Sequence, residues 1–266
     1  MSSITIVTAF FTMPSKFSTD TYREWMGNFL SLDENMIIFT DKENFSYIEK
    51  IRKSKKDKTS IIQSSIKDFD VYKHIDYWEY CKRIDREHHI HSKELYMIWN
   101  EKPFFMEKAL KMNKFNSEYF FWMDIGCVRD PIMLTRIGKF SCDGIPSDKI
   151  ILSKVTDSQI NTNLNNHGIS VSFENRGNIC CPILNCIQGG FFGGHKNAVK
   201  NWVKMYKNEL NLFMVTGTFG GKDQYIMGNL TIKFPEYITV LKPEEFPKFN
   251  SWWSFLVRMT DLQKYI

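Results

Sequence analysis

Residues 4–11 read Ile-Thr-Ile-Val-Thr-Ala-Phe-Phe, and this stretch sets the first element of the fold. It is uncharged and rich in β-branched and aromatic side chains, which predicts a buried strand. Residues 19–31 place apolar side chains at helical spacing, and residues 35–40 (Asn-Met-Ile-Ile-Phe-Thr) predict a second buried strand. A strand, a helix and a second strand in succession indicate an α/β protein with a mostly parallel sheet flanked by helices.

The rest of the chain continues the alternation of strands and helices. We expect a helix opened by Pro103 and running to about Asn113, strands at 119–123, 148–155 and 183–192, an amphipathic helix at 195–210 and a short helix at 222–229. Residues 42–98 are charged and irregular and allow no assignment, whereas residues 157–179 are typical of a loop. No linker or repeat is visible, so residues 1–266 are expected to form a single domain, with Trp252 and Trp253 packed on the main sheet.

The charge balance argues against a nucleic-acid partner. Lys and Arg number 35 against 30 Asp and Glu, a net charge of +5, and only residues 50–58 are densely basic. A nucleic-acid binder more often concentrates its positive charge on one face, so we expect this run to be a solvated surface loop. The small surplus is compatible with an acidic small-molecule substrate.

Composition also points to a cytoplasmic protein. Hydrophobic residues make up 43% of the 266 residues, enough for a full core, yet no apolar run has the length that spans a bilayer, so we expect no integral membrane segment. The cysteines are Cys81, Cys127, Cys142, Cys180, Cys181 and Cys186. No Cys-x-x-Cys pair occurs among them, so we expect reduced thiols rather than a zinc site or a disulfide framework.

The third predicted strand leads straight into Asp124. A carboxylate at the end of an apolar strand is costly to leave unpaired, so it is expected to meet a cation, a metal ion or a helix end. Ligands of parallel sheets bind beyond the carboxyl ends of the strands. Thr8, Ala9, Phe10 and Asp41 lie at the ends of the first two strands and are the first positions where we expect ligand contacts.

Two further motifs are weaker when taken alone. Gly189 and Gly190 lie inside a predicted strand, where paired glycines indicate either a close backbone approach to a ligand or simple turn chemistry. Asp223 and Gln224 begin a short helix, and Asp223 could merely cap it.

Residues 86–91 (Arg-Glu-His-His-Ile-His) bring three histidines together. A metal site needs ligands aimed at one point, whereas two of these histidines are adjacent. We therefore expect an exposed polar segment.

Taken together, these stretches resemble the HtrL/YibB family, a group of proposed GT-A-type glycosyltransferases, and more distantly glycogenin-like transferases. The residues that carry the resemblance are Thr5-Ile-Val-Thr-Ala-Phe-Phe11, Asn100-Glu-Lys102, Asn113-Lys-Phe115, Phe121-Trp-Met-Asp-Ile-Gly-Cys-Val-Arg129, Gly189-Gly-Phe-Phe-Gly-Gly194 and Lys222-Asp-Gln224. The resemblance implies a GT-A-type fold and a role in viral or bacterial glycan biosynthesis. Residues 42–95 have no counterpart in it.

The activity that the resemblance implies is that of a hexosyltransferase. It would move a sugar from a nucleotide-diphosphate sugar, with UDP-sugars favoured, to a glycan, lipid-linked or protein acceptor. In the resembling enzymes an Asp-x-Asp motif holds Mn²⁺ or Mg²⁺, which neutralises the diphosphate leaving group. Here Asp124 stands first in that motif and Gly126 replaces the second carboxylate. Asp130 or His195 could complete the metal site, with Asp124 and His195 as the expected ligands.

Other positions acquire roles through the same resemblance. Lys102 or Arg129 could pair with the phosphates in place of a metal. The expected substrate-binding residues are Thr8, Ala9, Phe10, Asp41, Lys102, Gln188, Gly189, Gly190 and Gln224. Asp223 is expected at the reacting centre, where a carboxylate can orient the acceptor, stabilise positive charge or act as a base.

Two alternatives compete with the transferase hypothesis. A catalytically degraded protein that binds nucleotide sugars would explain the missing second carboxylate. A sugar-nucleotide pyrophosphorylase would need a glycine-rich and basic loop after the first strand, where this chain has Phe-Thr-Met-Pro-Ser-Lys at residues 11–16.

Overall fold

A computed structural model describes residues 3–14, 17–154, 187–241, 253 and 255–260. The predicted loop at 157–179, Trp252, three of the cysteines and the first part of the predicted strand at 183–192 lie outside these ranges. No helix in the described ranges is both long and apolar enough to cross a bilayer.

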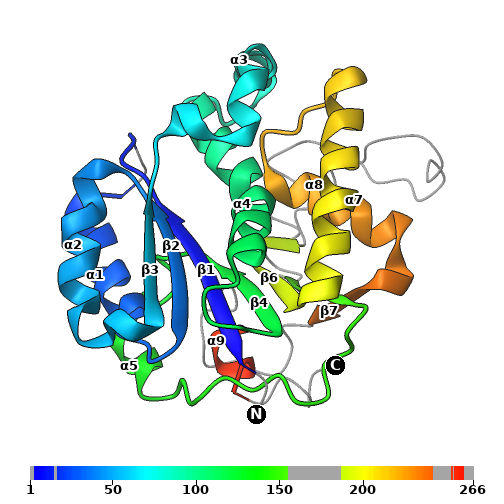
Figure 1. The fold of residues 1–266 in the computed structure, drawn as a ribbon. Helices are drawn as coiled ribbons and strands as arrows, with labels where there is room; N and C mark the ends of the chain where they lie inside the picture. The colour runs from blue at the N-terminus through cyan, green and yellow to red at the C-terminus, as the bar shows by residue number, and fades with distance from the viewer. Residues whose placement is uncertain (1–2, 15–16, 155–186, 242–252, 254, 261–266) are drawn as a thin grey trace.

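The described strands form one seven-stranded sheet (Figure 1). They are β1 (Ile4–Phe10), β2 (Asn35–Thr40), β3 (Thr59–Gln63), β4 (Tyr119–Met123), β5 (Ile150–Lys154), β6 (Ile187–His195) and β7 (Ile238–Leu241). Their order is β3-β2-β1-β4-β6-β5-β7, and β6 alone among them runs antiparallel to its neighbours. The prediction of an α/β fold with a mixed, mostly parallel sheet is confirmed.

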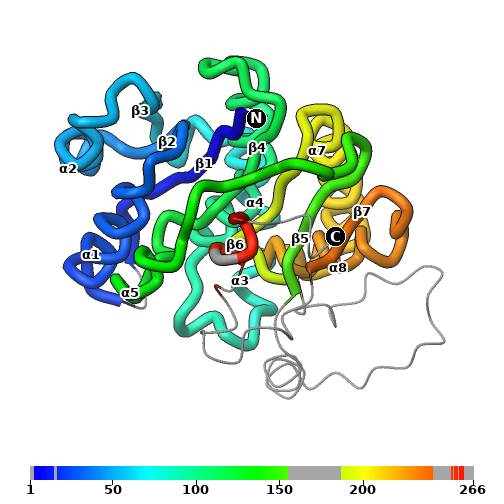
Figure 2. The backbone as a smooth tube through the Cα atoms, turned by 90° about the horizontal axis from the view of Figure 1, so that it is seen from below, coloured from blue at the N-terminus to red at the C-terminus, as the bar shows by residue number. Residues whose placement is uncertain are grey.

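Helices cover both faces of this sheet. They are α1 (Thr19–Leu30), α2 (Lys42–Arg52), α3 (Ile75–Ile84), α4 (Lys93–Met112), α5 (Pro131–Leu134), α7 (Lys196–Val215), α8 (Asp223–Lys233) and α9 (Phe255–Arg258), with short 3-10 helices η1 (Lys53–Lys58), η2 (Ile66–Asp68), η3 (Asp70–His74) and η5 (Pro235–Tyr237). Figures 1 and 2 both show α1 and α2 beside β2 and β3, with α7 and α8 toward β6 and β7.

Alternating side chains of the strands divide the core into two apolar clusters. Val7 of β1 and Trp122 of β4 pack with α3, α4, α7 and α8, whereas Ile6 and Phe121 pack with α1, α2, α5 and α9. Both layers follow from the period-two alternation of a strand that is buried on both faces. Trp253 is buried in the second layer, as predicted for the tail.

The helix around Pro103 begins much earlier than predicted. Helix α4 starts after Ser92, whose side chain accepts a hydrogen bond from the Leu95 N–H, and it runs through Pro103 without ending. A proline inside a helix removes one hydrogen bond and costs about 3 kcal/mol in isolation. The buried contacts of α4 described below offset that cost, and they were invisible to a local reading of the sequence.

The basic run at 50–58 is also more ordered than predicted. It forms the last turn of α2 and all of η1 rather than a loop. Within it, Arg52 is 1% exposed and donates to the carbonyls of Leu30, Leu32, Glu34 and Lys58 and to the Thr59 hydroxyl. The guanidinium therefore fastens α2 to β3 and to the end of α1.

Candidate active site

The reversed direction of β6 creates the site. Because β6 is antiparallel to β4, its first residues lie at the carboxyl end of β4, and the Asp124 N–H donates to the Gly190 carbonyl at 3.0 Å. Asp124 and Gly190, distant in sequence, thus meet at the edge where parallel sheets bind ligands.

Three consecutive polar residues of α4 are buried, and each fastens a different part of the molecule. Asn100 donates to the carbonyls of Gly220 and Gly221, just before α8. Glu101 accepts from the N–H groups of Asp70 and Val71 at the start of η3. Lys102 turns toward the sheet. The stretch Asn100-Glu-Lys102 therefore links α4 to the residues before α8, to the start of η3 and to β6.

The ammonium of Lys102 lies at the centre of a charge network and is 3% exposed. Its Nζ donates to the Gly189 carbonyl at 2.8 Å and lies 2.9 Å from Asp223 Oδ2 and 3.2 Å from Asp124 Oδ1. It also lies 5.6 Å from the centre of the Trp122 ring. A buried charge is tolerated only when it is paired in this way.

The network shifts the pKa of both of its most buried members. Burial alone would lower the pKa of Lys102, but the carboxylates of Asp124 and Asp223 outweigh it and hold that pKa above its ordinary value. Burial raises the pKa of Asp223, and the neighbouring Lys102 opposes this rise only in part. The lysine is thus firmly cationic.

Asp124 is the open member of the network, because 34% of its side chain is exposed. Its Oδ1 accepts from the Trp122 indole N–H at 2.8 Å, which fixes the carboxylate plane. The side chains of Asp124 and Lys102 both reach the wall of a cleft of about 330 Å³. Asp124 supplies its one carboxylate among the described residues.

The cleft lies at the carboxyl ends of β1 and β4, between α1 and the first turns of α4. Its walls are largely aromatic, with Phe10, Tyr22, Trp25, Trp99, Trp122 and Trp253 among them. Aromatic walls around a few charged groups are typical of a site that holds a small polar ligand with flat apolar parts.

The structure brings together most of the predicted site. Ala9 and Phe10 line the cleft with Lys102 and Asp124. Gly189 and Asp223 join them through the Lys102 ammonium, although Asp223 is 4% exposed and lies behind that ammonium rather than on the cleft wall. Gln224 supports the network from outside, since its amide donates to the Ile187 carbonyl of β6 at 2.8 Å.

Four predicted site residues lie away from the cleft wall, namely Thr8, Asp41, Gln188 and His195. Thr8 and Gln188 are 0% exposed and are absent from the described lining of the cleft. Asp41 caps α2, where its two carboxylate oxygens accept hydrogen bonds from the N–H groups of Asn44 and Thr12, and it is not among the described lining of the cleft. The hydrogen bonds of this cap outweigh burial and lower its pKa.

The prediction that His195 and Asp124 bind the same metal ion is wrong. It is the last residue of β6, pairs with Tyr119 at the start of β4 and lies 3.3 Å from Glu118. Asp124 follows the other end of β4, so the length of a strand separates the two side chains. The error arose because the sequence does not reveal that β6 is antiparallel.

The paired glycines make room for protein groups. A Cβ on Gly189 would lie 2.5 Å from Asp223 Oδ1, and one on Gly190 would lie 2.8 Å from the Trp253 ring. The sequence left open an approach to a ligand or simple turn chemistry, whereas the groups that approach these glycines in the structure are side chains of this chain.

Sequence analysis missed the pair Asp85 and His91. His88 and His89 are exposed as predicted, whereas His91 lines the cleft and its Nδ1 lies 2.8 Å from the buried Asp85 carboxylate. Burial alone would raise the pKa of Asp85, but hydrogen bonds from His91 and Tyr96 hold it at about 2. No local signal separates His91 from its exposed neighbours.

In the described part of the chain, two places could hold a divalent cation, and the residues present fit neither well. Asp85, Glu87 and His91 each offer a ligand atom within 4.8 Å of the others. Both Asp85 oxygens already accept hydrogen bonds, and Glu87 is paired with Lys222. At Asp124, the Lys102 ammonium lies against the carboxylate, which would repel a cation.

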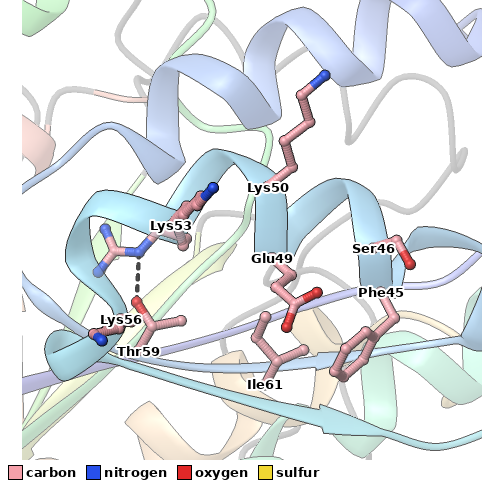
Figure 3. Close-up of a pocket in the computed structure, with 9 residues that line it drawn as sticks. Phe45, Ser46, Glu49, Lys50, Lys53, Lys56, Thr59 and Ile61 are labelled. Carbon is pink, nitrogen blue, oxygen red and sulfur yellow. Dashed lines mark hydrogen bonds between the residues drawn. The ribbon is translucent and has the colours of Figure 1, made fainter.

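A second pocket, of about 600 Å³, lies between α2, η1 and β3 (Figure 3). Its lining includes Lys50, Lys53 and Lys56 and shares no described residue with the cleft. Arg52 also lines this pocket, and its donors are engaged with protein carbonyls and with the Thr59 hydroxyl.

The buried Glu101 predicts a specific pH dependence of stability. Burial raises the pKa of Glu101 to about 7 from 4.5, against the opposing charge of Lys108. Between these values the folded chain holds a proton that the unfolded chain has lost, so the free energy of unfolding falls as the pH rises through this window. We expect this fall to be smaller in Glu101→Gln, measured by urea unfolding at several pH values. Parallel wild-type and variant curves would contradict the prediction.

Fold and cleft define the chain as an α/β protein with a cleft at the carboxyl ends of β1 and β4. A family model described as "Bacterial protein of unknown function (HtrL_YibB)" matches residues 2–254, and the chain belongs to this family. The expected family is thereby confirmed, and its description assigns no activity.

Two further comparisons give less. No curated protein matches the chain. Among solved structures it is similar to the apo crystal structure of mouse xyloside xylosyltransferase 1, with 9% sequence identity and a TM-score of 0.44 over 97% of this chain and 93% of that chain. A likeness of this strength carries no functional argument, so the function rests on the site itself.

Proposed function

We propose that this protein transfers a hexosyl group from a nucleotide-diphosphate sugar, with UDP-sugars favoured, to a hydroxyl of a glycan, lipid-linked or protein acceptor. The observation that carries the proposal is the pairing of the open Asp124 carboxylate with a buried lysine on the wall of an aromatic cleft. Flat aromatic walls suit a nucleobase and a sugar ring, and the charged end suits a reacting sugar phosphate.

The chemistry assigned to Asp124 is electrostatic. As the bond between the anomeric carbon and the phosphate oxygen breaks, positive charge develops on the sugar ring and negative charge on the leaving diphosphate. A fixed carboxylate that is already oriented by Trp122 stabilises the positive charge without reorganising. In this proposal, Asp124 therefore stabilises the positive charge that develops on the reacting sugar.

Lys102 and Asp223 hold that carboxylate in place. Asp223 was expected at the reacting centre, but its burial behind Lys102 supports a positioning role. The two carboxylates share one ammonium, so movement of Asp223 would displace Lys102 from Asp124. Asp223 thus acts on the sugar through Lys102.

His91 is the group that we propose to accept the proton of the acceptor hydroxyl. Its Nδ1 faces the Asp85 carboxylate, which must accept a hydrogen bond, so the proton sits on Nδ1 and Nε2 is left as the base. The acceptor oxygen then bonds to the anomeric carbon as its proton moves to Nε2. Because His91 lines the cleft, it can approach a bound acceptor.

The expectation of Mn²⁺ or Mg²⁺ rests on the family resemblance alone, because the residues at Asp124 and at Asp85 fit such an ion poorly. A divalent ion would supply charge to the diphosphate when bound, and the steps above do not require it. Cys81, Cys127 and Cys142 are free and buried, which supports the proposal of a reducing, cytoplasmic location.

The test is thermal stability against a panel of UDP-, GDP- and dTDP-sugars, combined with hydrolysis of the donor that binds. A ligand specific for the folded state raises the melting temperature. We expect one donor to do so and Asp124→Asn to lower its turnover by about 100-fold. His91→Gln should lower turnover while leaving donor binding intact.

Asp130→Asn is the matched control, because Asp130 is an exposed carboxylate that caps α5, a role that asparagine can fill. It should behave as wild type. Failure of every donor to stabilise the wild-type protein would refute the proposed function. Donor binding without hydrolysis or transfer would instead favour the alternative of a nucleotide-sugar-binding protein.

A further inference from the structure

We propose that Arg129, rather than a divalent metal ion, binds the diphosphate of the donor. This inference rests on the proposed function and names the group that would recognise the charged part of the substrate. It arises from the mismatch between the expected metal motif and the residues that this chain has in its place.

Arg129 lies on the cleft wall, in the segment that follows β4. Its guanidinium carbon is 4.2 Å from the centre of the Trp25 ring, 4.9 Å from that of Trp253 and 5.5 Å from that of Phe17. Phe17 and Trp25 come from α1 and the residues just before it, whereas Trp253 comes from a distant part of the chain. Cation–π contacts with three rings hold the guanidinium in one place on the cleft wall.

Among the residues that the structure describes, few groups use the hydrogen-bond donors of this guanidinium. In the described part of the chain, Nε makes a long contact of 3.4 Å with the Gly126 carbonyl, and no carboxylate pairs with Arg129. Aromatic rings cover the faces of a guanidinium but leave its N–H edge free. That edge matches two phosphate oxygens, which it can bind in parallel.

The other strongly basic group on the described cleft wall has no spare charge. Lys102 is shared between Asp124 and Asp223 and donates to the Gly189 carbonyl. Arg129 is therefore the group that can compensate a diphosphate. The wall thus has a negative carboxylate for the sugar and a positive guanidinium for the leaving group.

This arrangement replaces what a metal would do. In an Asp-x-Asp motif, two carboxylates hold a cation that neutralises the phosphates. Here Gly126 removes one carboxylate, the Lys102 ammonium engages the other, and the arginine five residues after Asp124 brings the positive charge directly. A positively charged side chain held in place by the protein can neutralise the phosphates without a metal ion from solution.

The experiment measures binding of UDP and of inorganic pyrophosphate by calorimetry, with EDTA present and then with added Mn²⁺. Wild type should bind UDP in EDTA. Arg129→Ala should weaken that binding by about 10- to 100-fold, the value of a hydrogen-bonded charge pair. Arg129→Lys should recover only part of the affinity, because lysine keeps the charge but loses the stacking and the parallel bonds.

Arg83→Ala is the control, because Arg83 is another exposed arginine over a ring, 5.9 Å from the centre of Tyr80, and it does not line the cleft. It should bind UDP like wild type. A melting curve for each variant confirms folding, and Arg129→Lys retains the cation if the alanine variant unfolds.

The outcomes separate the two proposals. Binding of UDP only after Mn²⁺ is added, or equal affinity of wild type and Arg129→Ala in EDTA, overturns the assignment of Arg129 but leaves the proposed function standing. Absence of UDP and pyrophosphate binding in both conditions also overturns the assignment of Arg129. The proposed function is overturned as well only if no UDP-, GDP- or dTDP-sugar of the donor panel stabilises the wild-type protein.

Discussion

Replacing Lys102 with methionine is expected to lower the free energy of unfolding by about 3–5 kcal/mol, the cost of breaking a buried ion pair by removing one partner. Methionine preserves most of the side-chain volume but leaves Asp223 buried beside Asp124 without a cation. The pKa of Asp223, already raised by burial, should rise further. Urea unfolding at neutral pH measures the loss, and donor turnover should fall with it.

The double variant Lys102→Met with Asp223→Asn separates charge from packing. Removing both charges should recover much of the lost stability, because the expensive species is the unpaired carboxylate rather than the missing contact. Activity should stay low, since Asp124 is still without its ammonium. A single variant that unfolds at the same urea concentration as wild type would show that Lys102 carries no such pairing.

Gly189→Ala is the second substitution with a large expected effect. Its methyl group would lie 2.5 Å from Asp223 Oδ1, closer than real Cβ atoms come to any neighbour. Asp223 is buried and held by Lys102 and by the Gln224 N–H, so it has little room to move. Overpacking of this kind costs about 1–3 kcal/mol, and displacement of Asp223 should also lower turnover.

Gly27→Ala is the matched control for this substitution. Gly27 lies inside α1, and a Cβ there would meet no atom within 4 Å. Alanine in a helix is favoured over glycine by about 0.5–1 kcal/mol, so this variant should be more stable than wild type and equally active. The same chemical change thus has opposite expected signs at the two positions. Loss of stability in both variants would contradict the explanation given for Gly189.

Local sequence patterns predicted the elements whose burial is either continuous, as in the inner strands, or periodic, as in an amphipathic helix. The apolar runs of β1, β2 and β4 and the amphipathic helix after β6 are legible because one-dimensional periodicity reflects burial directly. Residues 42–98 could not be assigned from local patterns, because α2 and α3 are rich in charged side chains and β3 is a short strand of only five residues. Contacts between segments that are distant in sequence, such as those of Arg52 with Leu30 and Leu32, stabilise this region. The path of α4 through Pro103 was hidden for the same reason.

The site was predictable in its residue types and less so in its geometry. A carboxylate after a buried strand indicated Asp124, and the family resemblance brought in Lys102 and Asp223. The sequence could not reveal that Lys102 joins the two carboxylates, because the three residues lie on different elements. Nor could it show that the Asp41 carboxylate caps α2 or that His91 turns toward the cleft.

The insertion of β6 between β4 and β5 also determines the order in which the chain can fold. The four strands β3, β2, β1 and β4 belong to the first half of the sequence and pair with one another directly. Strand β5 emerges next but has no neighbour on that side until β6 has been made. During synthesis the first half can therefore assemble early, whereas β5 remains unpaired on that side until β6 has been synthesised. The Lys102 ammonium likewise remains hydrated until β6 and α8 bury it. The candidate site around Lys102 is thus among the last regions to form as the chain folds.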